Sequence, residues 1–202
     1  KKQIYLCAGY KSDRLPKNYK KFINLKFETT NMMKTTIIGV ERALKYMSKK
    51  ENLLIIYGDC IYSDFFIKEI IIKTDKFSKI TMPVDLDWKS KWSNRYENIY
   101  EDAETLKYDL KSFELLSIGK KTFLEKDYMA QFMGIYILPN SKIRKYIDSY
   151  KSLKEDKRNK ISTTTFFENT NSINKVYVMP GIFSWTEVDT PEDLFYAKKT
   201  FS

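Results

Sequence analysis

Residues 84–106 hold the densest mixture of carboxylates, indoles and cations in the chain. Asp85, Asp87, Trp88 and Trp92 directly follow an apolar run that is typical of a strand. Open α/β sheets bind ligands at the carboxyl ends of their strands. These residue types therefore predict a site for a small charged substrate. The alternative is an amphipathic segment in which Trp88 and Trp92, four residues apart, both pack inward.

Two other acidic motifs lie far from this stretch. Gly58 and Asp59 end the strongest apolar run, residues 53–57, and Asp59 can bind a hard cation there. A Gly-Asp pair after a strand is also an ordinary turn. Glu187 and Asp189 stand two apart on a predicted strand, so they face the same side of it. Asp189 can bind a cation or help to cap the helix that follows.

The residue types exclude several kinds of site. The chain has no histidine, which removes histidine-based triads, histidine general bases and most catalytic zinc sites. Its two cysteines, Cys7 and Cys60, each end an apolar run, which predicts buried reduced thiols and no disulfide. Any metal is therefore expected to be a hard cation such as Mg²⁺ on carboxylates.

The formal net charge of +10 invites a nucleic-acid function. Lysines, however, are spread along the whole chain, and no stretch concentrates basic and aromatic residues as a stacking groove requires. We therefore predict no nucleic-acid partner. No apolar run has the length of a membrane span or the pattern of a signal peptide, which predicts a cytoplasmic protein without membrane contact. No oligomeric state is predicted.

Apolar periodicity alternates between strands and helices along the chain. Strands are predicted over 3–8, 21–27, 53–57, 80–84, 105–108, 112–118, 131–138, 175–179 and 184–188. Helices are predicted over 33–47, 65–72, 142–153 and 163–169, with a charged loop over 154–160 and a last helix that Thr190 caps and Pro191 begins. The alternation predicts one α/β domain with a mostly parallel sheet over residues 1–202.

A series of short motifs runs along most of the chain. They are Tyr57-Gly58-Asp59, Val84-Asp85-Leu86-Asp87-Trp88, Asp102-Ala103-Glu104-Thr105-Leu106, Ile118-Gly119-Lys120-Lys121, Gln131-Phe132-Met133-Gly134 and Trp185-Thr186-Glu187-Val188-Asp189-Thr190. In order and spacing they resemble nucleotidyltransferases of the phosphocholine, 2-aminoethylphosphonate and phosphoglutamine cytidylyltransferase group. The resemblance implies a GT-A-like, Rossmann-related fold with helices on both faces of a mixed, mostly parallel sheet.

The resemblance also implies an activity and its cofactor. Such enzymes transfer CMP from CTP to a phosphate or phosphonate with Mg²⁺, and Mn²⁺ is the alternative. Asp59 and Asp189, with Glu187, match the metal ligands. The positions that match the nucleotide-binding residues are Thr30, Asn31, Met32 and Gly58.

The same resemblance implies how the acceptor is bound. Lys120 or Lys121 falls where a lysine meets the phosphates, and Arg95 is expected to add positive charge near the acceptor. The positions expected to line the acceptor pocket are Asp85, Asp87, Trp88, Trp92, Glu104 and Gln131. Acids around an anionic acceptor make sense if the acceptor also bears an ammonium group. We therefore expect a zwitterion of the phosphoglutamine, phosphocholine or aminoethylphosphonate type, for cell-surface or capsule polysaccharide modification.

Two departures from the group's pattern stand out. Leu86 occupies a position where related sequences often carry lysine, which bears on the identity of the acceptor. The group also opens with a glycine-rich loop and a Pro-Lys pair that bind the triphosphate. Residues 8–15 resemble that loop superficially but lie too close to Thr30, and they better match the group's second strand. We therefore expect that roughly fifty residues, including the triphosphate-binding segment, are missing from the front.

Two other functions stay open at this point. The pair Asp85 and Asp87 forms a DxD motif after a strand, as in glycosyltransferases that use a nucleotide sugar. Without the glycine-rich loop, the chain could also be a non-catalytic nucleotide-binding module.

Overall fold

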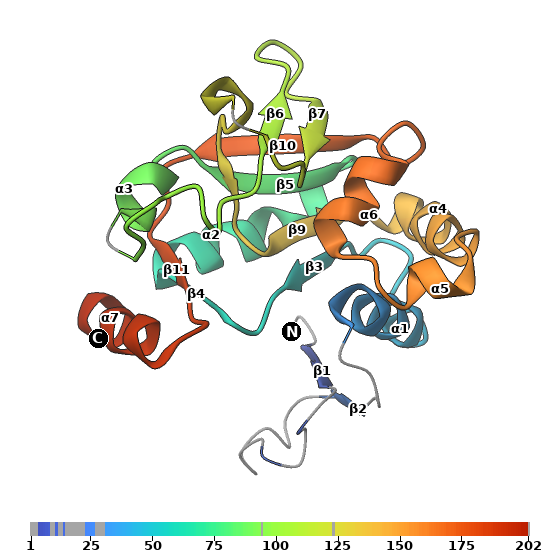
Figure 1. The fold of residues 1–202 in the computed structure, drawn as a ribbon. Coiled ribbons are helices and arrows are strands. Elements are labelled where there is room, and N and C mark those ends of the chain that lie inside the picture. Colours follow the sequence, from blue (N-terminus) through green and yellow to red (C-terminus); the bar gives the residue numbers. More distant parts are fainter. Residues whose placement is uncertain are drawn as a thin grey trace.

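A five-stranded mixed sheet forms the centre of the molecule (Figure 1). The computed structural model describes residues 4–8, 11, 14, 23–26, 31–93, 95–122 and 124–201. The order of the central strands is β10 (Val176–Gly181), β5 (Ile80–Asp85), β9 (Ile135–Leu138) and β3 (Leu53–Ile56), and β8 (Gln131–Phe132) also pairs with β5. Strand β10 is parallel to β5, whereas β9 is antiparallel to both β5 and β3. Thus β3, β5 and β10 point the same way, and the sheet is mixed, as predicted. It is not mostly parallel in its pairing, however, because β9 and β8 lie antiparallel to the strands that they contact.

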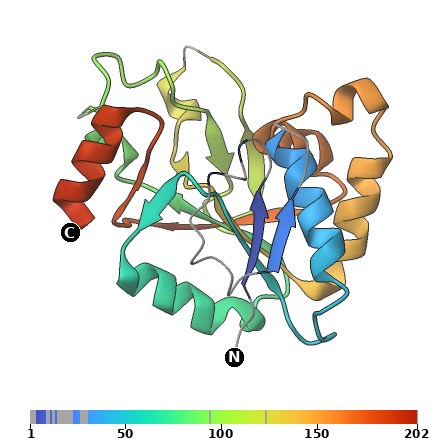
Figure 2. The same ribbon diagram turned by 90° about the horizontal axis from the view of Figure 1, so that it is seen from below.

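Helices cover both faces of this sheet, as expected (Figure 2). One face packs against α1 (Met32–Ala43), α4 (Asn140–Lys151) and α6 (Thr163–Thr170). The other packs against α2 (Asp64–Lys73) and α3 (Trp88–Trp92).

Strand β9 shows how the sequence divides the core into two. Tyr136 and Leu138 belong to the apolar cluster beneath α1, whereas Ile135 and Ile137 belong to the cluster beneath α2. Successive side chains of a strand point to opposite faces, and all four are fully buried. A continuous apolar strand is therefore required between the two helical layers.

Smaller elements surround the sheet. They are the parallel pair β1 (Tyr5–Ala8) and β2 (Ile23–Lys26), the antiparallel pairs β4 (Cys60–Tyr62) with β11 (Trp185–Glu187) and β6 (Leu106–Tyr108) with β7 (Leu115–Ile118), the helices α5 (Glu155–Arg158) and α7 (Pro191–Phe201), and 3-10 turns at Thr74–Lys76 and Glu125–Asp127. The cap predicted for the last helix is confirmed. The backbone N of Asp193 donates to Oγ1 of Thr190 at 3.1 Å, and the Thr190 hydroxyl bonds Asp193 in return.

Several predicted elements differ in the structure. The helix expected over 33–47 ends at Ala43, and a turn follows it. The strand expected over 112–118 begins at Leu115, because Asp109 accepts hydrogen bonds from the next turn of chain and holds it as a tight turn. The strand expected over 131–138 divides into β8 and β9 at Gly134, which has φ +68°. A Cβ there would lie 2.7 Å from Sγ of Cys60, so glycine is required. The charged loop over 154–160 contains the short helix α5.

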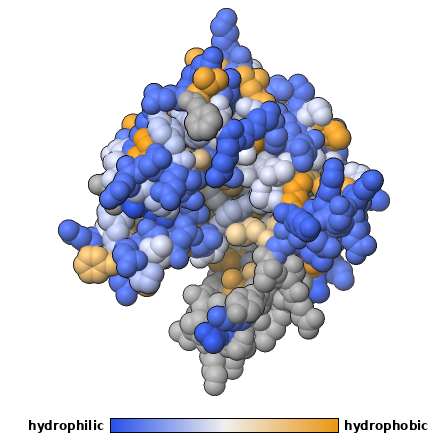
Figure 3. All heavy atoms as spheres, in the orientation of Figure 1, coloured by the Kyte–Doolittle hydropathy of each residue, from blue (hydrophilic) through white to orange (hydrophobic). Residues whose placement is uncertain are grey.

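The predictions on cysteines and membrane segments can be compared directly. Cys7 and Cys60 are free thiols, as predicted, although each is only partly buried. Among the described residues, none of the helices combines the length and the apolar character that crossing a bilayer would need. Hydrophilic residues cover most of the face in Figure 3, with apolar residues scattered between them.

The contribution of the apolar cluster beneath α1 to stability can be tested at Met82, at the centre of β5. Met82 is fully buried in a cluster that includes side chains of the neighbouring strands β10 and β9 and of the helices α1, α4 and α6. We expect Met82→Ala to lower the free energy of unfolding by about 2–5 kcal/mol, because it leaves a cavity in a close-packed core. Urea unfolding measures this value. The control Leu116→Ala removes an exposed side chain of β7 and should change it by less than about 0.5 kcal/mol. Equal effects of the two changes would contradict the assigned core.

Candidate active site

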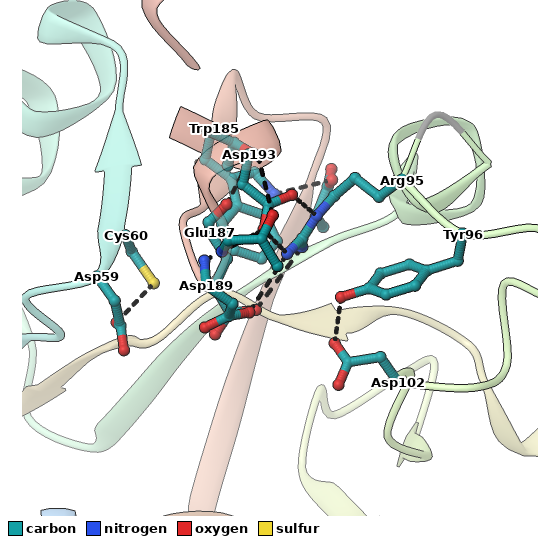
Figure 4. A network of polar contacts seen from close by, with 12 residues as sticks. Asp59, Cys60, Arg95, Tyr96, Asp102, Trp185, Glu187, Asp189 and Asp193 are labelled. Atoms are coloured by element: carbon teal, nitrogen blue, oxygen red, sulfur yellow. Dashed lines mark hydrogen bonds and ion pairs between the residues drawn. The ribbon is translucent and has the colours of Figure 1, made fainter. Parts of the chain in front are cut away.

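Four acidic side chains from separate segments gather beside the sheet (Figure 4). Carboxylate oxygens of Asp102, Glu187 and Asp189 lie within 4.8 Å of one another. A second group, with the same limit, consists of Asp59, Cys60 and Glu187. Glu187 belongs to both groups and therefore stands at the centre of the acidic cluster, which we define as Asp59, Asp102, Glu187 and Asp189.

Pairing between β4 and β11 brings the distant parts of the acidic cluster together. Glu187 on β11 lies opposite Cys60 on β4, and the backbone N of Val188 donates to the carbonyl oxygen of Asp59 at 2.9 Å. The turn after β3 and the end of β11 are thus fixed side by side. Of the three predicted metal ligands, Asp59 and Asp189 are therefore each brought close to Glu187, in two groups that share this residue.

The electrostatics of the acidic cluster fit a divalent cation. Burial, and then the charges of Asp189 and Asp59, raise the pKa of Glu187 to about 7, and Arg95 only partly offsets them. Carboxylate oxygens are the donors that hard cations prefer, and close carboxylates repel one another without a counter-charge. The residues present therefore suit Mg²⁺ or Mn²⁺.

Arg95 supplies the nearest positive charge to the acidic cluster. Its side chain is 5% exposed, and its Nε donates to Oδ1 of Asp193 at 2.8 Å. Its Nη2 donates to Asp189 at 3.3 Å, and Nη1 lies 3.9 Å from Glu187. Burial alone would raise the pKa of Asp193, but hydrogen bonds from Arg95 and from the backbone of Asp189 and Thr190 lower it to about 2. Arg95 was predicted to lie near the acceptor, and the structure places it among these acids.

Asp85 lies at the end of β5 and is fully buried. Its carboxylate accepts hydrogen bonds from Nζ of Lys91 at 2.7 Å and from Nε1 of Trp185 at 3.0 Å. Backbone nitrogens of Asp87 and Phe183 donate to it at 3.3 Å each. Protein donors therefore occupy both oxygens of a residue that was predicted to line the acceptor pocket, whereas Asp87 is partly exposed beside Lys91.

The other predicted acceptor residues are also well packed. Trp88 and Trp92 are 1% and 2% exposed and belong to the apolar cluster beneath α2, which agrees with the alternative that both pack inward. Gln131 on β8 is buried opposite Asp85. Glu104 is mostly buried and accepts from Oγ1 of Thr164 at 3.0 Å.

The predicted nucleotide-binding residues lie at the starts of two elements. Asn31 caps α1, since its Oδ1 accepts from the backbone N of Lys34 at 2.7 Å. Met32 begins that helix and is exposed. Gly58 lies in the turn after β3, with open space where a side chain would stand. Thr30 lies outside the described residues.

The two predicted phosphate-binding lysines differ in their surroundings. Nζ of Lys120 lies 2.6 Å from Glu168, whereas none of the ion pairs within the described part of the chain involves Lys121. Lys121 instead lines a cavity of about 360 Å³. The other lining residues are Asn98, Tyr100, Thr122, Glu125 and Tyr128. Sequence reasoning missed this cavity, and it placed Asp102 in a motif without giving it a role in metal binding.

Stability measurements against pH test the acidic cluster. The native protein holds a proton on Glu187 more tightly than the unfolded chain does, because the pKa rises from 4.5 to about 7. The free energy of unfolding should therefore fall as pH increases through that window, by at most ~3 kcal/mol. Urea unfolding in EDTA should show this fall in the wild type and its absence in Glu187→Gln. Identical pH profiles for the two proteins would refute the conclusion that Glu187 holds its proton more tightly in the folded protein.

Comparison of the sequence with those of known proteins identifies a relative. No family model matches the chain. The chain is 30% identical over 161 residues to CTP:phosphoglutamine cytidylyltransferase from Campylobacter jejuni subsp. jejuni serotype O:2, an alignment that covers 76% of this chain. The chain spans 61% of the length of that relative.

Solved structures share the fold. The inositol-1-phosphate CTP transferase from T. maritima superposes with a TM-score of 0.59 at 16% identity, over 85% of this chain and 62% of that one. HddC from Yersinia pseudotuberculosis, complexed with GMP-PN, superposes with a TM-score of 0.57 at 18% identity. That match covers 98% of this chain and 78% of the HddC chain. The predicted mixed α/β, Rossmann-like fold is confirmed. The chain is thus related in sequence to a CTP:phosphoglutamine cytidylyltransferase and has the fold of nucleotidyltransferases, so the resemblance carried by its motifs is confirmed.

Proposed function

We propose that the protein transfers CMP from CTP to a small phosphorylated or phosphonylated amine and releases pyrophosphate. Sequence similarity to a relative named for CTP and phosphoglutamine supports this activity and favours an acceptor of the phosphoglutamine type. Phosphocholine and aminoethylphosphonate are the other acceptors of the predicted class. The cytoplasmic location and the role in capsule or cell-surface polysaccharide modification stay predictions.

The acidic cluster is the observation that carries the proposal. Asp59, Glu187 and Asp189 would hold Mg²⁺, with Asp102 as a further oxygen donor and Mn²⁺ as the alternative cation. A bound divalent cation would neutralise phosphate charge and orient the pyrophosphate leaving group. The raised pKa of Glu187 supports this assignment, because burial first, and then the charges of Asp189 and Asp59, disfavour its carboxylate and Arg95 offsets them only partly.

The protein's own residues hold and orient the reactants in this proposal. A phosphate or phosphonate acceptor is already an anion at neutral pH, so no general base is needed, which agrees with the absence of histidine. Of the two predicted lysines, Lys120, once released from Glu168, would supply positive charge near phosphate groups. Arg95 fixes Asp189 and Asp193 relative to each other, and so holds the end of β11 in place.

A glycosyltransferase of the DxD type receives less support. Its motif would need both Asp85 and Asp87 as metal ligands or nucleotide contacts. Asp85 is fully buried, and its oxygens accept hydrogen bonds from Lys91 and Trp185. Neither residue belongs to an acidic group that could hold a metal among the described residues.

The proposed reaction predicts a defined pattern in a pyrophosphate-release screen. With Mg²⁺ present, the full-length protein should release pyrophosphate from CTP with phosphoglutamine, phosphocholine or aminoethylphosphonate, and more slowly from UTP or ATP. Omission of the acceptor controls for hydrolysis of the nucleotide. A nucleotide-binding module without catalytic activity would bind CTP in calorimetry but release no pyrophosphate. This result would refute the proposal.

Asp59 provides a sharper test of the cation site. We expect Asp59→Asn to lower kcat by about 100-fold or more, because one charged ligand of the cation is lost. A Mg²⁺ titration of pyrophosphate release should also shift to higher concentration. The matched control is Asp64→Asn, whose carboxylate is 95% exposed on α2 and pairs with Lys68. Unchanged kcat in Asp59→Asn would exclude Asp59 as a ligand.

A further inference from the structure

The cavity beside Lys121 combines two opposite charges with an aromatic wall. The cavity of about 360 Å³ lies at the lower end of the usual size for small-molecule sites. Tyr100 and Tyr128 form its wall, with ring centroids 5.0 Å apart in an edge-to-face arrangement. The buried ring of Trp88 supports them from behind, at 6.1 Å from Tyr100 and 6.0 Å from Tyr128. Trp88 thus reaches the cavity indirectly, through the two tyrosines.

One side of the cavity suits an ammonium group. Glu125 is exposed, and its Oε1 accepts a hydrogen bond from the Tyr100 hydroxyl at 2.8 Å. The hydrogen bond holds the carboxylate against the tyrosine ring. A carboxylate next to aromatic rings attracts an ammonium both by charge and through the ring faces. The protein's own Lys89 shows this attraction, because its Nζ lies 5.7 Å from the centroid of the Tyr100 ring and donates to the Tyr100 hydroxyl at 3.3 Å. A primary ammonium can in addition donate hydrogen bonds to Glu125.

The other side of the cavity suits a carboxylate. Lys121 is exposed and takes part in none of the ion pairs given by the described residues, whereas its neighbour Lys120 pairs with Glu168. Asn98 accepts from the backbone N of Tyr100 through Oδ1 at 3.1 Å, so its NH₂ group serves as a donor. An ammonium and an amide in one cavity can bind a carboxylate by charge-assisted hydrogen bonds.

The cavity is connected to the acidic cluster by one loop. Asn98 and Tyr100 belong to residues 95–105, the loop that also supplies Asp102 to the acidic cluster. The Tyr96 hydroxyl donates to Asp102 at 3.3 Å and supports this loop from within (Figure 4). Lys121 and Asp102 also lie close enough to Glu104 to affect its pKa in opposite directions, after burial and the Thr164 hydrogen bond.

We propose that this cavity binds the amino-acid head group of the acceptor, with Glu125 and Tyr100 on the α-ammonium and Lys121 and Asn98 on the α-carboxylate. The inference rests on the proposed function and specifies its acceptor. A phosphorylated amino acid satisfies both charges of the cavity, whereas phosphocholine has no carboxylate for Lys121 and no N–H for Glu125. The phosphorylated end of the acceptor would then extend toward the acidic cluster.

The test pairs two variants with truncated acceptors. Glu125→Gln and Lys121→Met are assayed by pyrophosphate release with phosphoglutamine, with its analogue lacking the α-ammonium and with its analogue lacking the α-carboxylate. Glu125→Gln should lower kcat/KM for phosphoglutamine by about tenfold or more and leave the analogue without an ammonium unaffected. Lys121→Met should do the same, with the analogue without a carboxylate unaffected. Matched controls are Glu101→Gln and Lys126→Met, exposed neighbours outside the cavity lining.

The outcomes separate this inference from the proposed function. If a variant lowers kcat/KM by the same factor for all three acceptors, its side chain acts on the phosphate or on the fold, and the inference is wrong while the function stands. If the wild type releases no pyrophosphate with any acceptor, the proposed function fails. Calorimetry of phosphoglutamine binding then tests whether the cavity binds the head group. Weaker binding by both variants than by the wild type supports the inference. No binding by the wild type, or equal binding by the variants, overturns it.

Discussion

The buried carboxylate of Asp85 is the interaction on which the arrangement of the site depends. Burying a charge costs free energy unless donors surround it, and here they come from two other segments of the chain, the one with Lys91 and the one with Phe183 and Trp185. Lys91 on α3, Trp185 on β11 and the backbone of Phe183 all converge on the end of β5. Trp185 precedes Glu187 by two residues on the same strand, so the position of the acidic cluster follows from this one junction. Through Asp85, the Asp-Leu-Asp-Trp segment thus connects β5 with α3 and β11.

Much of the fold could be predicted from apolar periodicity. The strand over 53–57 and the helix beginning near Met33 lie where the pattern places them, although β3 is an outer strand that is only partly buried, with Ile56 exposed. The direction of β9 could not be predicted, because a continuous apolar run is compatible with either direction. The same holds for the break at Gly134, where the need for glycine arises from the distant Cys60. Contacts between remote segments decide both features.

The residues of the candidate site also differ in how well the sequence predicted them. Asp59, Glu187 and Asp189 were predicted as a group because their motifs occur in a known order, and the structure places Asp59 and Asp189 each near Glu187. Trp88 and Trp92 looked suited to a ligand pocket by residue type, yet helical spacing placed them equally well in the core, where they lie. The cavity walls escaped prediction, since Tyr100, Lys121 and Glu125 belong to no common motif and meet only through loop conformation. Asp102 joins the acidic cluster for the same reason.

The pairing of β4 with β11 has a consequence for the order in which the molecule matures. Its two strands are neighbours in space, although the long stretch of chain between Tyr62 and Trp185 separates them in the sequence. During synthesis, Asp59 and the central strand β3 leave the ribosome long before residues 185–189 exist. Contacts at such separation form late, because a long loop must first be closed. A nascent chain would therefore remain unable to assemble all four carboxylates until the strand β11 is made.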